Sequence, residues 1–526
     1  MTAGRLSTAL STTRSRLGNV SEITSEFKLG AKVSSFDCRS CVLIASVVIL
    51  GMSGSSSTLA EETHWRPSQK SALADVLRRT AELKDVNHQL WNFAEVGLEE
   101  TKSSQLLVAK LKAAGFDVRT GVAGMPTAFI ATYGSGKPVI GLLAEYDALP
   151  DLSQKIAPMQ EPAEPGRPGH GCGHCGLGTG ALGAALAVKA AMEIHKLPGT
   201  LRLIGTPAEE TLIGKVYMLL DGDGGFDDLD VCFHWHPGTR NEVWNGSSKA
   251  MVSAKFTFHG LAAHAAGSPE QGRSALDAVE LMNIGANYMR EHLREDSRIH
   301  YVITSGGGAP NVVPATATVW YYVRANDHKD VEAAYGWLND IARGAALMTR
   351  TKMTAAIDTD CHELLTNTPL SEVLHRNLKQ LEPPSFTAEE QVFARKLQQP
   401  LVEQLQKTFE KAVDDAIQPL AAVPEVSKGS TDVGDVSWFV PTSGLRTACF
   451  PAGSPGHSWQ NVASIGSSIG EKGVIYAAQI LSVSILDLLE QPDEVAAARA
   501  DWQQRMKDRK YTTLIPKGQR TPSKIR

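Results

Sequence analysis

The sequence is poor in cysteine and carries little excess charge. Its 526 residues include 7 cysteines, too few for the disulfide framework on which small secreted domains depend. The formal net charge is −5, and no stretch interleaves basic with aromatic residues, so nucleic-acid binding is not expected. With 42% hydrophobic and 21% charged residues, the composition is typical of a soluble globular protein with more than one core.

Long apolar runs are also scarce. The run at residues 41–52 has 12 residues, fewer than the about 20 that a membrane-spanning helix needs. It follows a Ser/Thr-rich segment with scattered Arg and Lys, and small residues lead to Ala60, which is typical of a secretory signal. We therefore predict a signal or targeting segment at residues 1–60 and an exported, periplasmic or secreted protein. The alternatives are a retained N-terminal anchor, or a disordered tail with one buried helix on a cytoplasmic protein. We expect no other membrane-spanning segment.

Strand and helix patterns alternate in the first half of the chain. Helical periodicity marks residues 72–93, 102–114 and 177–194, and short apolar runs lie at 128–132, 139–144, 201–205 and 231–235. This alternation predicts an α/β layer with a largely parallel sheet. Ligands of such sheets gather beyond the carboxyl ends of the strands. Glu145 and Asp147, Glu209 and Glu210, and His236 each follow an apolar run, so we expect them to meet at one edge.

The pattern changes at about residue 251. Up to residue 357 the expected order is strand, helix, strand, strand, helix, strand, which describes a compact ferredoxin-like unit. We predict a catalytic domain made of residues 62–245 and 366–495, interrupted by an inserted domain at 246–365. Residues 496–526 are expected to form a polar, basic tail with a peripheral helix and a frayed end.

A glycine-rich loop at residues 169–175 contains thiol and imidazole groups. Cys172 and His174 are two residues apart, so in an extended segment they share one face, where they would suit Zn²⁺ or Mn²⁺. The alternative is a turn with a buried cysteine and a hydrogen-bonded histidine. The Cys172-x-x-Cys175 spacing also matches redox proteins, but it lies in a Gly/His loop, so a thiol–disulfide protein is the minor interpretation.

Two adjacent carboxylates, Glu209 and Glu210, follow the apolar run 201–205. Buried together they would repel each other, unless a metal ion takes one as a ligand and leaves the other to accept a proton from water. The alternative is a solvated acidic pair at a helix N-terminus. His236 stands at a strand end before Pro237, whereas His234, one step inside, is expected to pack. His457 lies in a Gly/Pro loop, and it is a candidate ligand only because the other candidate ligands are present.

These motifs resemble the M20 family of metallo-amidohydrolases. The similarity is to the branch with hippurate hydrolases, auxin-conjugate hydrolases and, most of all, the amidohydrolases of the aminobenzoyl-glutamate hydrolase type. The motifs occur in the expected order over about residues 70–490. They are residues 91–95, 144–150, 171–174, 206–210, 235–237, 262–265, 309–314, 430–434 and 455–460. The resemblance implies an α/β fold: a zinc-peptidase-like catalytic α/β/α domain with an inserted ferredoxin-like α+β dimerisation (lid) domain.

The resemblance also implies roles for individual residues. Two divalent ions, Mn²⁺ or Zn²⁺, would be held by Cys172, His174, Glu210, His236 and His457, with Cys172 bridging them as a thiolate. Glu209 would be the general base. His264 would reach a neighbouring subunit's active site and stabilise the oxyanion, while Asn311 and Arg324 would hold the substrate carboxylate. Cys175 departs from the pattern, because many relatives carry Asp or Asn there.

We therefore predict a metal-dependent amidohydrolase that cleaves the amide bond of an N-acyl amino acid of the p-aminobenzoyl-glutamate type. It would act as a homodimer, or with a related second subunit. A dipeptidase or aminoacylase of the same fold is the alternative enzyme. A non-catalytic metal- or solute-binding protein is the alternative from another class, but a binding protein would need Glu210 and not Glu209.

Overall fold

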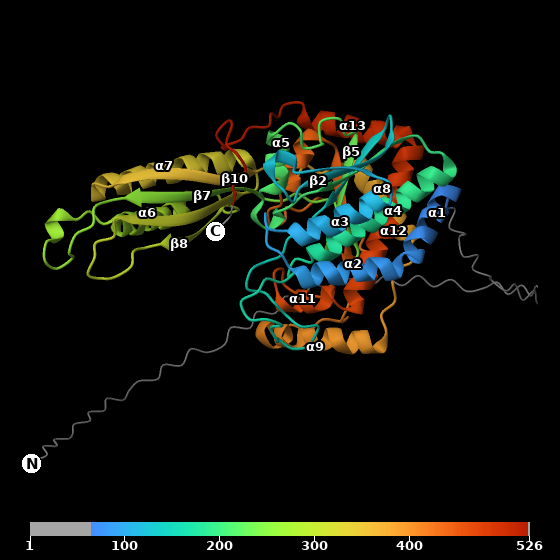
Figure 1. Ribbon diagram of the computed structural model, residues 1–526, viewed down its shortest axis with the longest axis horizontal. Helices are drawn as coiled ribbons and strands as arrows, with labels where there is room; N and C mark the ends of the chain where they lie inside the picture. Colours follow the sequence, from blue (N-terminus) through green and yellow to red (C-terminus); the bar gives the residue numbers. More distant parts are fainter. Residues whose placement is uncertain (1–64, 524–526) are drawn as a thin grey trace, which may run out of the picture. The chain divides into compact units, whose positions relative to one another are not determined.

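The computed structural model describes residues 65–523, which form two sheets with their helices (Figure 1). The larger sheet has seven strands in the order β1-β2-β4-β3-β5-β11-β6. Its central strands β4 (Gly199–Gly205), β3 (Val139–Ala144), β5 (Val231–Gly238) and β11 (Thr442–Ala448) are parallel. The outer strands β1 (Asp117–Thr120) and β2 (Phe129–Ser135) on one side and β6 (Glu242–Trp244) on the other pair antiparallel. The predicted parallel arrangement is confirmed for the four central strands, but the sheet as a whole is mixed, because its outer pairings are antiparallel.

Helices cover both faces of this sheet because its central strands are apolar on both sides. Along β3, Ile140 and Leu142 enter one core and Val139 and Leu143 enter the other, as the two-residue period of a strand requires. The first core is covered by α1 (Pro67–Arg78), α2 (Thr80–Phe93), α3 (Thr101–Ala113), α4 (His174–His195), α8 (Thr368–Gln380), α12 (Ser468–Glu490) and α13 (Pro492–Met506). The second is covered by α5 (Gly214–Leu220) and α10 (Val433–Phe439). The chain also forms α9 (Ala388–Leu405), α11 (Trp459–Ile465) and the short helices η1 (Val122–Gly124), η2 (Glu209–Thr211), η3 (Pro269–Gln271) and η4 (Arg290–His292).

Helices α4 and α12 are long and apolar enough to cross a membrane, by length and composition alone. Their apolar windows are 89% and 83% buried, so they are the core helices of the larger sheet. Glycine lets α4 approach closely: a Cβ at Gly180 would lie 2.6 Å from the ring of Trp235 on β5. Composition alone does not distinguish such a core helix from a membrane span.

The inserted domain comprises β7 (Ala250–His259), α6 (Ala275–Met289), β8 (Arg298–Ser305), β9 (Thr316–Ala325), α7 (His328–Thr349) and β10 (Lys352–Cys361). Its four antiparallel strands have the order β10-β7-β9-β8. Alternate residues of β9, such as Val319 and Val323, pack with α6 and α7 in a separate core. The predicted strand–helix order is confirmed, and the domain interrupts the larger α/β layer.

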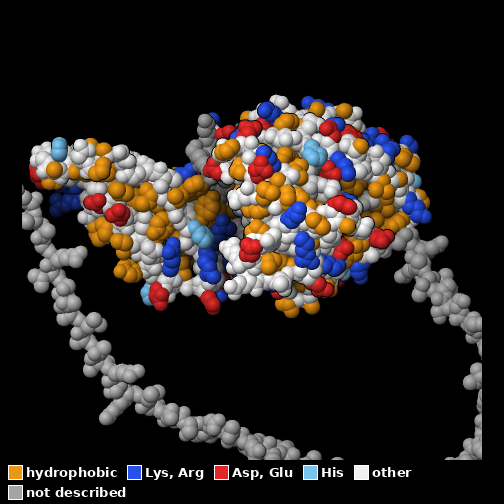
Figure 2. Space-filling view, turned by 90° about the horizontal axis from the view of Figure 1, so that it is seen from below, with side chains coloured by type: hydrophobic (Ala, Val, Ile, Leu, Met, Phe, Trp, Pro, Cys, Tyr) orange, Lys and Arg blue, Asp and Glu red, His pale blue; other side chains and the backbone are white. Residues whose placement is uncertain are grey.

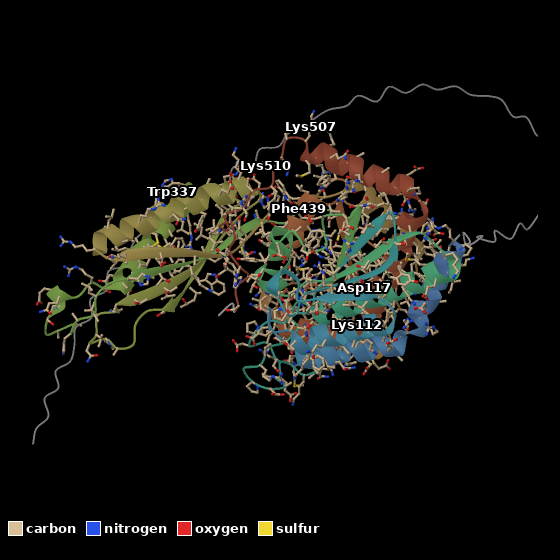
Figure 3. The ribbon with its side chains drawn as sticks, turned by 45° about the horizontal axis from the view of Figure 1, so that its top comes forward. Lys112, Asp117, Trp337, Phe439, Lys507 and Lys510 are labelled. Carbon is tan, nitrogen blue, oxygen red and sulfur yellow. The ribbon has the colours of Figure 1, made fainter. Side chains whose placement is uncertain are left out.

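The C-terminal segment after α13 is not frayed, contrary to our prediction. It begins at Lys507, labelled in Figure 3, and makes hydrogen bonds to elements of both domains. Tyr511 donates to Asp435 on α10 at 2.8 Å, and the amide of Gln519 donates to the carbonyl of Ile357 on β10 at 2.8 Å. The segment is polar in composition, but long-range hydrogen bonds and the buried Ile515 fix it. The predicted signal segment, residues 1–60, lies outside the described residues.

Candidate metal centre

The candidate centre lies where strands of the larger sheet end. Glu145 directly follows β3, and the turn η2, which begins at Glu209, follows β4. His236 lies near the end of β5, and α4 begins at His174. Parallel strands present their carboxyl ends at one edge, so these side chains converge as the sequence predicted.

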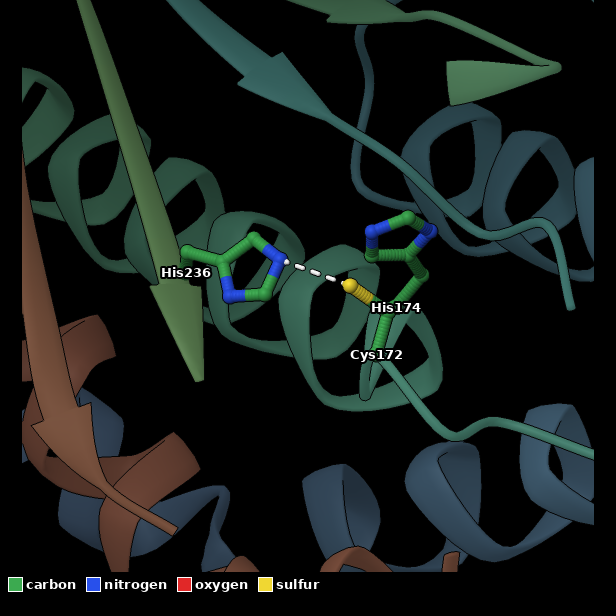
Figure 4. A group of neighbouring side chains, drawn as sticks. All are labelled: Cys172, His174 and His236. Carbon is green, nitrogen blue, oxygen red and sulfur yellow. Dashed lines mark hydrogen bonds between the residues drawn. The ribbon is translucent and has the colours of Figure 1, made fainter. Parts of the chain in front are cut away.

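Two groups of potential ligands share Cys172. The thiol of Cys172 lies 3.2 Å from Nε2 of His236, and with His174 they form one group (Figure 4). Cys172, Glu210 and His457 form the other, in which Oε2 of Glu210 lies 3.3 Å from Nε2 of His457. Within each group the ligand atoms lie within 4.8 Å of one another. One thiol therefore stands where two three-ligand sites meet.

Asp147 organises both groups, a role the sequence did not reveal. Its Oδ1 lies 2.9 Å from Nδ1 of His174, and its Oδ2 accepts the backbone N–H of Glu210 at 2.9 Å. A carboxylate on one ring nitrogen is the usual support of a metal-binding histidine, because it leaves the other nitrogen to the metal. Among residues 65–523, the buried Nε2 of His174 and Oε1 of Glu210 have no hydrogen-bond partner. Unpaired buried polar atoms of this kind fit a metal site.

The electrostatics indicate a concentration of negative charge. Burial raises the pKa of Glu210 to about 8, with Asp147 and Glu145 reinforcing burial and His174 opposing it. Burial, then Glu145, holds the pKa of Glu209 well above its usual range. Burial and then His174 lower the pKa of His236 to about 3, so this imidazole is neutral and able to act as a ligand.

A buried lysine offsets part of that charge. Nζ of Lys215, on α5, lies 2.8 Å from Glu145 and 2.6 Å from Asp432, and the side chain is fully buried. Burial lowers the pKa of Lys215, but Asp432 and Glu145 outweigh burial and raise it, so the lysine is charged. In the sequence, the one indication of this role is that a lysine stands at the start of an otherwise apolar helix.

A buried carboxylate outside the turn fixes the backbone of the turn that carries Glu209 and Glu210. Ala208 precedes it with φ +57°, a left-handed conformation that is unfavourable for alanine. Its N–H donates to Oε1 of Glu100 at 2.8 Å, and Thr127 donates to Oε2 at 2.9 Å. Glu100 is fully buried and therefore fixes the backbone next to Glu209. Sequence reasoning did not identify Glu100.

A cavity of about 330 Å³ opens onto the centre and includes residues of the inserted domain. Arg324 of β9 lines it and donates from Nη1 to the hydroxyl of Ser430 at 3.1 Å. His264 and Asn311 do not line the cavity, and they lie together because Ala265 donates its N–H to the Asn311 carbonyl at 3.0 Å. One chain thus brings together the predicted residues except these two.

Cys175 does not belong to the centre. It lies in α4, fully buried in the core beneath the sheet, and both Cys172 and Cys175 are free thiols. His234 packs with its ring 5.4 Å from that of Trp244, as expected for a packed histidine. A thiol–disulfide function therefore has no support from the geometry, because only one of the two cysteines faces the cavity.

Comparison with known proteins agrees with this geometry. Residues 141–481 match the model of peptidase family M20/M25/M40. The chain is 39% identical to the B subunit of p-aminobenzoyl-glutamate hydrolase from Escherichia coli, over 84% of this chain and 96% of that protein. It is 27% identical to the Xaa-Arg dipeptidase of Mus musculus, over 84% and 95%. Its fold is similar to a dinuclear metal-binding M20 peptidase of Bacillus subtilis, with a TM-score of 0.52, 16% identity, and coverage of 79% of this chain and 99% of that one. The chain belongs to peptidase family M20/M25/M40, whose members hydrolyse amide bonds.

Proposed function

We propose that this chain is a metal-dependent amidohydrolase that cleaves the amide bond of an N-acyl amino acid of the p-aminobenzoyl-glutamate type. The observation that carries the proposal is the pair of ligand groups sharing Cys172, next to the carboxylate of Glu209. The name of the E. coli relative supports the substrate class.

Two divalent ions, Zn²⁺ or Mn²⁺, would be held by these groups. Cys172, His174 and His236 would bind one, and Cys172, Glu210 and His457 the other, with the thiolate between them. When bound, the ions supply Lewis acidity that activates water and the amide carbonyl. The mixed thiolate, imidazole and carboxylate set suits both candidate metals.

Glu209 moves the proton in this proposal. It lines the cavity, and its Oε2 lies 3.7 Å from Nε2 of His174. With His174 and Glu145 it forms a third group of potential ligands, which does not include Cys172. A carboxylate in this position can act as a general base. Glu209 would take a proton from the attacking water and pass it to the leaving amine, while Arg324 holds the carboxylate of the amino acid.

A second copy of the chain would complete the site. Nδ1 of His264 accepts backbone N–H groups from Ala266 and Gly267, at 3.2 and 3.0 Å, so the proton of a neutral ring is on the outward Nε2. That N–H is suited to donate to an oxyanion, and Asn311 beside it to grip a carboxylate. The edge strand β8 exposes Tyr301, Val302 and Ile303, and Figure 2 shows hydrophobic side chains along the inserted domain. We propose this edge for homodimer contact; a related second subunit would use the same surface.

The N-terminal pattern supports a further proposal, that residues 1–60 direct export. The domain boundaries of 62–245 with 366–495, and 246–365, are likewise proposals. Mass spectrometry of the mature protein tests the first, because removal of the segment would leave an N-terminus near Glu61.

The function is tested with purified protein, Mn²⁺ or Zn²⁺, and a panel of N-acyl amino acids. We expect release of the free amino acid from at least one N-acyl amino acid, abolished by a chelator and restored by the metal. Hydrolysis restricted to dipeptides with a free amino group would replace the proposal with a dipeptidase. Metal-independent hydrolysis would contradict it.

A further inference from the structure

One wall of the cavity contains an arginine that the proposed chemistry does not use. Arg446 lies on β11 between two strands, with its Cα opposite His236 of β5 and opposite Glu242 of β6. Its guanidinium lies over the ring of Trp244, 4.4 Å from the centroid. Arg446 and Trp244 both line the cavity, and the arginine starts beside a candidate metal ligand.

The stack of Arg446 on Trp244 is held in place from several sides. Nη1 of Arg446 donates to Oε1 of Glu242 at 3.1 Å, and Nε of Arg240 lies 3.4 Å from the other oxygen of that carboxylate. Two arginines thus share one glutamate, and the group keeps a net positive charge. His234 packs edge-on to Trp244. A third of the Arg446 side chain remains exposed (33%), so the planar group is fixed but accessible.

The two arginines of the cavity come from different parts of the chain. Arg324 belongs to the inserted domain and is tied to Ser430, whereas Arg446 rises from the larger sheet beside His236. An N-acyl amino acid has its carboxylate on one side of the scissile bond and its acyl group on the other. If Arg324 holds the carboxylate, the wall of Arg446 and Trp244 in the same cavity is left to contact the acyl group.

We propose that Arg446, stacked on Trp244, forms the acyl subsite and recognises an aromatic acyl group through its guanidinium face. The inference rests on the proposed amidohydrolase function. Guanidinium planes stack on aromatic rings, and an ammonium group does not offer the same flat surface. A saturated ring of equal size fills the space but lacks the π-face. The subsite therefore selects N-aroyl over N-alkanoyl amino acids.

The test compares acyl groups on one leaving amino acid: N-benzoyl-, N-(4-aminobenzoyl)- and N-cyclohexanecarbonyl-glutamate. Arg446→Lys keeps the charge and removes the planar group. We expect kcat/KM for the two aroyl substrates to fall about 10-fold and that for the cyclohexane analogue to change less than about twofold. Arg240→Lys is the matched control, because Arg240 shares Glu242 but does not line the cavity; it should leave all three unchanged.

Equal losses for aroyl and saturated acyl groups would overturn the inference. A loss of activity with N-benzoylglutamate but not with N-benzoylglutamine would also overturn it. The two substrates differ only in the side-chain carboxylate of the amino acid, so Arg446 would then hold that carboxylate. If the unmodified enzyme hydrolyses no N-acyl amino acid, the proposed function fails. Calorimetric binding of benzoylglutamate and its cyclohexane analogue to the metal-loaded protein and to Arg446→Lys then still decides the subsite. Circular dichroism and metal content establish that both variants fold.

Discussion

The catalytic and inserted domains hold their candidate residues in opposite ways. His174 and Glu209 are buried and fixed by Asp147 and Glu100, which reach them from distant parts of the chain. His264 and Asn311 lie outside the cavity and are held by the backbone of their own loops. The first set is therefore assembled within one chain, whereas the second is not, which agrees with our proposal that His264 and Asn311 act in the site of a neighbouring subunit.

The comparison predicts its largest effect at Glu209. Glu209→Gln keeps the size of the side chain but removes the base, so kcat should fall about 10²- to 10⁴-fold, the usual contribution of a general base. Glu209 also forms a group of potential ligands with Glu145 and His174, so metal content separates the two roles: it should be unchanged for a base and lowered for a ligand. The exposed Glu270→Gln serves as control. Near-normal turnover of Glu209→Gln would refute the assignment.

His264→Ala should cost about 10²- to 10³-fold in kcat, as the loss of one oxyanion donor does. The most informative test of His264 is complementation between two inactive variants in one dimer. Mixed dimers of His264→Ala with Glu209→Gln contain one intact site, so an equal mixture should regain about a quarter of normal activity if subunits pair at random. If the mixture is no more active than the separate variants, the proposed role of His264 in a neighbouring subunit is wrong, because His264 would then act within its own chain or not at all.

Asp147→Asn should weaken metal binding about 10- to 100-fold, as loss of the carboxylate behind a ligating histidine commonly does. Activity should return at high metal concentration, which a metal titration of kcat measures. Asp435→Asn is a control among buried carboxylates, since Asp435 bonds to Tyr511 and the backbone of His362. An unchanged metal affinity in Asp147→Asn would remove Asp147 from the centre.

The smallest effect concerns the joint between the domains. His328 lies 2.8 Å from Asp360, whose other oxygen accepts the N–H of Leu514. Burial lowers the pKa of His328, but the Asp360 hydrogen bond and charge outweigh it and raise the pKa above 6.5. The charged pair thus adds stability below about pH 6.5 that is lost as pH rises through the raised value.

His328→Gln should therefore lower the melting temperature by a few degrees at pH 6 and by less at pH 9. Thermal unfolding at both pH values measures the difference. A deficit that is constant with pH, or larger at pH 9, would contradict the role of the charge.

Sequence patterns predicted strands β2 to β5 and the order of elements in the inserted domain, and they pointed to the residues that the structure brings together at the candidate centre, because period and motif are local properties. They did not predict the central strand β11. They placed Asp147 at this edge of the sheet but did not reveal its role behind His174, and they did not identify Glu100 or Lys215. These roles depend on contacts far along the chain; Glu100 and Ala208 are 108 residues apart. The prediction for the C-terminal segment failed for the same reason, since a polar composition does not reveal long-range hydrogen bonds. The spacing of Cys175 links it to the loop of Cys172, but as part of α4 it enters the core.

The central claim, that Cys172 joins two metal sites, is tested most directly by counting metal ions per chain by mass spectrometry in three proteins. The unmodified protein should hold about two ions. His236→Ala removes a ligand of one group and should leave about one ion, whereas Cys172→Ala removes a ligand of both and should leave fewer than one, with activity lost. Two ions and normal turnover in Cys172→Ala would contradict the shared thiolate.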